Sequence, residues 1–224
     1  MLKRPTLSER LYPSISAATI VATWNDALIN RLLECVWVAY DSLHIEVLAS
    51  VDFSRPSDDL ERELTEKLFQ RIQRQFDFSM PVYPMHAFAE RESRPNPPGQ
   101  PPLYDIAFVL NANDRLCWAL EAKVLDSDAN TVRNLGDYVK TFNERFLACR
   151  YAPFSPSAAM LGYLKTGNPN TALDHLTLWL SCTMASHPKF PTRVHRTSEH
   201  TRVVESGSSY PSQFRCHHLM MPLN

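Results

Sequence analysis

The stretch "LYDIAFVLNANDRLCWALEAKVL", residues 103–125, consists of two apolar runs around a polar turn. This pattern predicts a β-hairpin in the interior of a sheet, because short apolar runs bounded by turn residues are typical of buried strands. Outside the turn, three charged residues interrupt the apolar runs: Asp105 opens the first strand, and Glu121 and Lys123 close the second. An unpartnered charge in an apolar interior is costly. We therefore expect these three residues either to lie at a solvated end of the sheet or to bind a partner.

Two registers of the hairpin are compatible with the sequence. In the first, Asp105 lies across from Glu121 with Lys123 diagonal to it, so that all three side chains share one face. In the second, a four-residue loop at 111–114 shifts the pairing by one residue. That shift turns the two acids to opposite faces unless a bulge restores the parity. A shared site therefore requires the first register or a bulge.

A helix is expected directly before this region, at residues 57–76. Ser57 is a plausible N-cap, and Asp58 and Asp59 lie in the first turn, where the helix dipole favours acids. At about 100° per residue, the apolar residues of this segment form a stripe whose centre lies close to the direction of Glu61. Glu61 is therefore expected on the buried face of its helix.

The remaining segments predict a single α/β domain, residues 1–224, with a central mixed β-sheet flanked by helices. The segment at 168–182 begins like a helix after Asn168-Pro169 but is ambiguous, and the polar, basic segment at 188–212 is expected to be a loop. The other expected elements are a helix at 15–40, a β-rich stretch at 43–53, a strand at 80–92, a helix at 126–152, a strand at 158–167 and a final edge strand at 214–223.

Composition limits the function classes. With 44% hydrophobic and 21% charged residues among 224, the chain has the composition of an ordinary globular protein. A net charge of −1 argues against coating nucleic acid by bulk electrostatics, although residues 126–224 carry 10 basic against 7 acidic residues. Five widely spaced cysteines without a CxxC pair argue against a secreted disulfide framework, and no uncharged stretch is long enough to span a membrane. We expect a cytoplasmic protein without a membrane partner.

The hairpin charges are suited to metal-dependent hydrolysis. Two carboxylates on adjacent strands repel each other unless a cation lies between them, and an all-oxygen ligand set suits Mg²⁺ or Mn²⁺. Lys123, two residues beyond Glu121, projects on the same side and can orient a water or offset the charge of a phosphate. The alternative is purely structural: Asp105 caps a turn, and Glu121 pairs with Lys123 or Arg133 at a wet sheet edge.

Asp105 followed by Glu121-Ala122-Lys123 resembles the PD-(D/E)xK motif of a nuclease superfamily that includes many restriction endonucleases. The resemblance covers residues 57–150, and Tyr104 stands where the motif name has proline. It implies a restriction-endonuclease-like fold with Mg²⁺ (or Mn²⁺) held by Asp105 and Glu121, Lys123 at the attacking water, and Glu61 as a further metal-binding and catalytic acid.

The helix after the motif adds candidate phosphate contacts. Asn134 and Tyr138 resemble the Gln-xxx-Tyr pair of recombination exonucleases, with asparagine in place of glutamine. Lys140 and Arg145 follow on the same helix, although exposed helix charges need no functional reason. The resemblance implies a metal-dependent nuclease acting on DNA, by analogy in a bacterial phage-defence or restriction system, with targeting through a homo-oligomer or a partner subunit. The alternative is a non-catalytic interaction or scaffold subunit that retains the fold.

The C-terminal part, 151–224, is expected to complete the sheet and to carry a basic loop. That loop either contacts a nucleic-acid backbone or is a disordered or partner-binding segment. The Cys-His-His sequence at 216–218 matches no usual closed zinc set. The basic and histidine residues of the expected loop are Arg193, His195, Arg196, His200 and Arg202.

Overall fold

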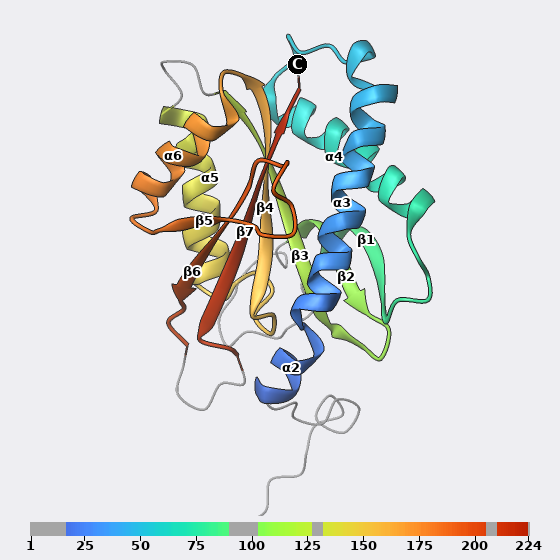
Figure 1. Ribbon diagram of the computed structural model, residues 1–224, viewed down its shortest axis with the longest axis vertical. Helices are drawn as coiled ribbons and strands as arrows, with labels where there is room; N and C mark the ends of the chain where they lie inside the picture. Colours follow the sequence, from blue (N-terminus) through green and yellow to red (C-terminus); the bar gives the residue numbers. More distant parts are fainter. Residues whose placement is uncertain (1–16, 90–102, 127–131, 205–209, 224) are drawn as a thin grey trace, which may run out of the picture.

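A seven-stranded mixed β-sheet forms the centre of the protein (Figure 1). The computed structural model describes residues 17–89, 103–126, 132–204 and 210–223. The strand order is β1-β2-β3-β4-β7-β6-β5, in which the β3–β4 and β4–β7 pairs are parallel and the other pairs antiparallel. The strands are β1 (Val82–Ala89), β2 (Leu103–Leu110), β3 (Asn113–Asp126), β4 (Ser157–Thr166), β5 (Met184–Ser186), β6 (His195–Thr201) and β7 (Gln213–Pro222).

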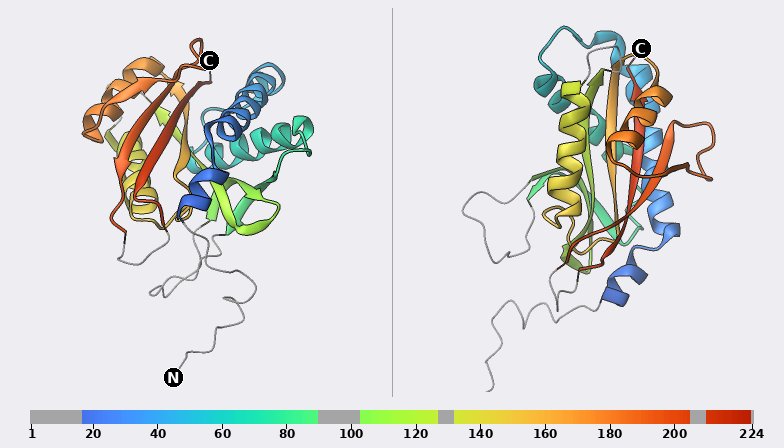
Figure 2. Two further views of the ribbon diagram at one scale, coloured as in Figure 1. Left: turned by 60° about the horizontal axis from the view of Figure 1, so that its bottom comes forward. Right: turned by 90° about the vertical axis from the view of Figure 1, so that its left-hand side faces the viewer.

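Helices cover both faces of the sheet, which confirms an α/β protein with a mixed sheet flanked by helices. One face is covered by α3 and α4, and the other by α5 and α6 (Figures 1 and 2). The helices are α2 (Ala17–Thr23), α3 (Asp26–Glu46), the 3₁₀ turn η1 (Leu48–Ser50), α4 (Ser57–Gln75), α5 (Val132–Thr141), the π-helical segment η2 (Phe142–Leu147) and α6 (Pro169–Trp179).

Strand β3 lies between two hydrophobic cores, one on each face of the sheet. Trp118 and Leu120 pack into the core beneath α3 and α4. Cys117 and Ala119 point the other way and pack into the core beneath α5. Because both faces are covered, the strand has a continuous apolar run rather than an alternating pattern. This burial is what makes charged residues at the end of the same strand exceptional.

The predicted helix at 57–76 is confirmed as α4. Leu60, Leu64 and Leu68 are fully buried along its stripe. The N-cap prediction is wrong: Pro56 occupies the cap position, without a side-chain hydrogen bond, and Ser57 is the first helical residue. The helix therefore begins without a side-chain cap and relies on its two first-turn acids and on packing.

The N-terminal prediction is wrong in two respects. The helix expected at 15–40 is interrupted near Asn25, whose side chain accepts a hydrogen bond from the Leu28 backbone N–H at 3.0 Å and so caps α3. The β-rich stretch expected at 43–53 does not form, because α3 continues to Glu46 and η1 follows. Leu43 is fully buried, so packing against the sheet outweighs the β propensity of this segment.

Two predictions for the C-terminal part also need correction. Residues 195–201, expected within a loop, form β6, and β7 is an interior strand between β4 and β6 rather than an edge strand. The sequence of β6 is polar and does not predict a strand. The segment is a strand because its backbone groups pair with β7. The ambiguous segment at 168–182 contains α6, where the Asn168 side chain accepts hydrogen bonds from the backbone N–H groups of residues 170 and 171.

Candidate functional site

The observed hairpin register brings the two acids of the motif together. Ile106 pairs with Leu120, and extending this register places Asp105 across from Glu121. Nearer the turn the register shifts at residues 109–110, which marks a bulge. The turn thus differs from both expected loops. Beyond the bulge, however, the two strands pair in the register that puts the acids on one face, as a shared site requires.

Asp105 is held by the backbone of the neighbouring strand. Its Oδ2 accepts a hydrogen bond from the Ala122 N–H at 2.7 Å. Burial raises the pKa of Asp105 above its ordinary value, although the Lys123 ammonium and the Ala122 hydrogen bond act in the opposite direction. The carboxyl group is therefore fixed in place and poorly hydrated.

Glu121 is the most unusual group of the site. Its residue is 3% exposed. Its Oε1 lies 3.3 Å from Arg145 Nη1 and 3.6 Å from Lys123 Nζ, whereas the buried Oε2 has no hydrogen-bond partner. Burial, reinforced by the charge of Asp105, raises the pKa of Glu121 to about 8. A buried carboxylate with an unpartnered oxygen is costly for the fold and is a feature of sites that bind a cation.

Lys123 lies at the centre of the charged cluster. Its Nζ donates to Glu61 Oε1 at 2.7 Å and to the Ala122 carbonyl at 2.6 Å. Burial lowers the pKa of Lys123, but the carboxylates of Glu121, Glu61 and Asp105 together raise it above its ordinary value. Lys123 is therefore an ammonium ion at neutral pH.

Glu61 reaches the same cluster from α4. Its Oε2 accepts a hydrogen bond from the Val124 N–H at 3.2 Å, so both of its oxygens have partners. Burial raises the pKa of Glu61, against the lowering effect of Lys123. Within the described residues, the oxygens of Glu61, Asp105 and Glu121 do not form a group of three ligand atoms within 4.8 Å of one another. The structure therefore joins Glu61 to the site through Lys123.

Arg145 is a partner of Glu121 that the sequence suggested only as a phosphate contact. It lies in the π-helical segment η2, which continues α5, and its guanidinium donates to the hydroxyl of Tyr151 as well as contacting Glu121. Tyr151 in turn donates to the Leu103 carbonyl at 2.6 Å. π-Helical turns often occur at functional sites, but hydrophobic spacing alone does not reveal them.

A polar pocket of about 570 Å³ opens beside this cluster. Its wall includes Glu61 and Lys123, and α5 and η2 contribute Lys140 and Arg145. The structure thus brings four of the predicted residues to one cavity, whereas Asp105 and Glu121 do not line it but interact with Lys123 on its wall. The start of α4 completes the wall with Pro56, Ser57 and Asp58.

Tyr138 does not contact this pocket, so its predicted role as a phosphate contact is not supported by its position. The residue is fully buried, and its hydroxyl lies 2.9 Å from His218 Nδ1. The reason is the phase of α5: Tyr138 shares the buried face with Leu135, whereas Lys140 points to solvent. Asn134 belongs to α5, but its side chain lies outside the described residues.

The expected basic loop is not a free cationic surface. Arg193 donates to Asp41 at 2.7 Å and Arg196 donates to Asp174 at 2.7 Å. Arg202 is buried and donates to the backbone carbonyls of residues 152, 153, 155 and 211. The arginines therefore tie this part of the chain to α3, α6 and neighbouring loops. His195 is buried and His200 is half-buried.

No protein-family model, curated protein or solved structure matches this chain. Among the described residues, none of the helices combines the length and the apolar character needed to cross a membrane.

Proposed function

We propose that the protein is a metal-dependent nuclease of the PD-(D/E)xK type that hydrolyses phosphodiester bonds in DNA, with a restriction-endonuclease-like fold. The observation that carries this proposal is the state of Glu121, whose buried Oε2 has no partner although Asp105 and Lys123 lie beside it. Purely structural ion pairs would satisfy both oxygens of a buried carboxylate.

The residues present fit a bound Mg²⁺ or Mn²⁺. When ionised, Asp105, Glu121 and Glu61 supply three negative charges against the two positive charges of Lys123 and Arg145. The donor set consists of oxygens alone, which hard divalent cations prefer. Asp105 and Glu121 would hold the ion, and once bound it supplies Lewis-acid polarisation of a phosphoryl oxygen and lowers the pKa of a coordinated water.

Lys123 acts in this proposal as a positioning and charge-stabilising group. Because its pKa is raised by the surrounding carboxylates, it donates hydrogen bonds at neutral pH and does not act as a general base. Glu61 holds the ammonium at 2.7 Å and so sets where Lys123 points. A fixed ammonium offsets the charge that develops on a pentacoordinate phosphoryl group.

The pocket wall carries charges of both signs, so only its cationic residues are suited to contact an anionic nucleic-acid backbone. Lys140 and Arg145 supply cations on its wall, while Asp58, Asp137 and Glu144 supply anions. With a net charge of −1, the chain lacks the electrostatic attraction that long DNA requires by itself. We therefore place target selection in a homo-oligomer or a partner subunit, as in a bacterial restriction or phage-defence system. The free cysteines of the described chain fit a reducing, cytoplasmic setting.

A non-catalytic scaffold is the second candidate, and one observation favours it. Lys123 pairs with Glu61, and Arg145 contacts Glu121, so four of the site's charges have protein partners without any metal. A protein that had lost catalysis would retain such pairs as structural contacts.

The experiment is a cleavage assay of the purified full chain on plasmid and linear DNA with Mg²⁺, Mn²⁺ or EDTA. Lys123→Ala should lower the metal-dependent rate by about 100-fold or more, which is the usual loss when one charge-stabilising donor is removed. The matched control is Lys67→Ala on α4, which removes a lysine paired with Glu63 and absent from the pocket wall.

Equal cleavage by the wild type and the Lys123→Ala protein would contradict the role of Lys123. Absence of cleavage by the wild type with either metal, together with unimpaired biological function of the variant in cells, would support the scaffold. Circular dichroism of both variants shows whether the fold is retained.

A further inference from the structure

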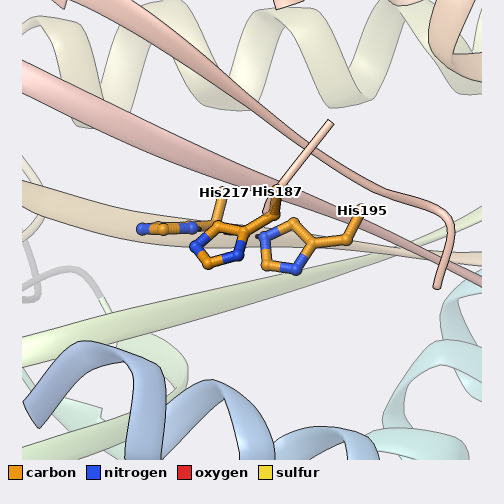
Figure 3. Close-up of side chains that lie close together, drawn as sticks. All are labelled: His187, His195 and His217. Atoms are coloured by element: carbon orange, nitrogen blue, oxygen red, sulfur yellow. Dashed lines mark hydrogen bonds between the residues drawn. The ribbon is translucent and has the colours of Figure 1, made fainter. Parts of the chain in front are cut away.

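Three histidine side chains meet between the sheet and α3, remote in sequence from the motif (Figure 3). His187 follows β5, His195 begins β6, and His217 lies in β7. All three are buried. One ring nitrogen of each lies within 4.8 Å of those of the other two. Three buried imidazoles that converge from three segments form a set of neutral nitrogen donors.

Side chains alternate between the two faces along a strand, so His217 points to the opposite face from its sequence neighbours Cys216 and His218. His217 lies on the side of β7 that packs with Leu219 beneath α3, whereas Cys216 belongs to the core on the opposite face. His218 points the same way as Cys216 and bonds to Tyr138. The Cys-His-His sequence at 216–218 is therefore not a ligand set, and the spatial group draws one member from each of three segments.

The hydrogen bonds of the group leave a nitrogen unsatisfied. His195 Nε2 lies 3.2 Å from His217 Nδ1, and the buried His217 Nε2 has no partner. His195 Nδ1 faces the indole N–H of Trp37 at 3.5 Å, and His187 Nδ1 faces the backbone N–H of Lys189 at 3.3 Å. Both contacts are long for hydrogen bonds. The Nδ1 atoms of His195 and His187 are therefore only weakly bound by protein partners, and the unpartnered Nε2 of His217 lies on the opposite side of its ring from the nitrogen that faces His195.

One nitrogen–nitrogen distance of the group already suits a tetrahedral metal. Zn²⁺ lies about 2.0–2.1 Å from imidazole nitrogens, so that two ligands of one ion are about 3.3–3.4 Å apart. The separation of 3.2 Å between His195 Nε2 and His217 Nδ1 is close to that value. The rings of His187 and His195 are stacked, with centroids 4.6 Å apart. Ligation therefore requires the His187 ring to turn out of this stack.

We propose that His187, His195 and His217 form a transition-metal site, with Zn²⁺ as the preferred ion and a fourth position open to water. Three imidazoles without a carboxylate or thiolate among them suit Zn²⁺ and not Mg²⁺, which takes oxygen ligands. The site is thus chemically separate from the acids of the pocket. It ties β6, β7 and the segment after β5 together at the far edge of the sheet.

The surrounding charges are compatible with a bound dication. Burial and the charges of Arg215 and Lys189 lower the pKa of His187, while Asp26 acts in the opposite direction. Arg215 is paired with Glu199 at 2.6 Å and Asp26 at 2.9 Å, so much of its charge is compensated. Burial lowers the pKa of His195 to about 3, which leaves this ring neutral and able to ligate without losing a proton at neutral pH.

The test measures Zn²⁺ binding by the purified full chain after treatment with a chelator. Titration calorimetry and elemental analysis should find one Zn²⁺ per chain, and the midpoint of thermal unfolding should rise when Zn²⁺ is added. His187→Gln should weaken binding by more than about 100-fold, because loss of an outer-shell partner alone costs 10–100-fold. The matched control is His175→Gln, an exposed histidine on α6, which should bind as the wild type does.

Two further measurements keep the result independent of folding and of the proposed nuclease. X-ray absorption of the Zn²⁺-loaded wild type should show three imidazole nitrogens at about 2.0–2.1 Å. The double variant Asp105→Asn/Glu121→Gln should keep full Zn²⁺ affinity while losing Mg²⁺-dependent cleavage. The proposal is overturned if the wild type binds no Zn²⁺ at micromolar concentration, if His187→Gln binds as tightly as the wild type, or if the double variant loses Zn²⁺.

Discussion

Replacing Glu121 with glutamine should stabilise the metal-free protein at neutral and alkaline pH. The side chain is buried, one of its oxygens has no partner, and its pKa is about 8 in the folded chain against 4.5 for an exposed glutamate. A carboxyl group whose pKa is raised by folding prefers to be protonated in the folded state. The contribution of Glu121 to stability is therefore fully present below about pH 4.5 and is lost as the pH rises through about 8.

The magnitude follows from the two pKa values. Each pKa unit corresponds to 1.36 kcal/mol, so the raised pKa of Glu121 makes the free energy of unfolding about 3 kcal/mol lower at pH 7 than below pH 4.5. Glutamine has nearly the same shape and carries no charge to desolvate. We expect the Glu121→Gln protein to be about 1–3 kcal/mol more stable than the wild type at pH 7–8, with the difference vanishing below pH 4.5.

Urea unfolding at pH 4.5, 6, 7 and 8, with and without Mg²⁺, measures the effect. Mg²⁺ at one hundred times its dissociation constant should stabilise the wild type by about 2.7 kcal/mol and the variant by less, since the variant lacks a ligand. Glu66→Gln, an exposed change on α4, is the matched control and should leave the pH profile unchanged. The reasoning is refuted if the Glu121→Gln protein is no more stable than the wild type at pH 8, or if the two pH profiles run parallel.

Two further predictions concern the interior of the fold. Gly162→Ala should destabilise the protein by about 1–3 kcal/mol in urea unfolding, because an added Cβ would lie 2.7 Å from atoms of both Leu125 and Met220. An unchanged unfolding midpoint would show that these two side chains move aside freely. Arg202→Met should cost at least about 2 kcal/mol, because it removes the donors to buried carbonyls such as those of Ser155 and Pro211. Arg202→Lys should recover only part of that loss, and full recovery would mean that charge rather than the array of donors matters.

The sequence by itself determined the elements whose signal is local. The leucine stripe of α4 and the two apolar runs of the hairpin have the periodicity of buried faces, which short-range backbone geometry translates directly into a helix and strands. The same pattern identified Asp105, Glu121 and Lys123 as charges out of place, and their convergence depends on one adjacent pair of strands. The pattern could not choose between the two registers of the hairpin, and the structure decides between them with a bulge near the turn.

The tertiary structure decided everything that depends on distant partners. Whether β7 lies at an edge or in the interior depends on its pairing with β4 and β6, and the polar β6 is a strand only because that partner exists. Tyr138 points into the core, Arg145 reaches Glu121 through a π-helical turn, and three histidines meet across the far edge of the sheet. The free energy of such contacts comes from groups far apart in the chain, so no local periodicity records them.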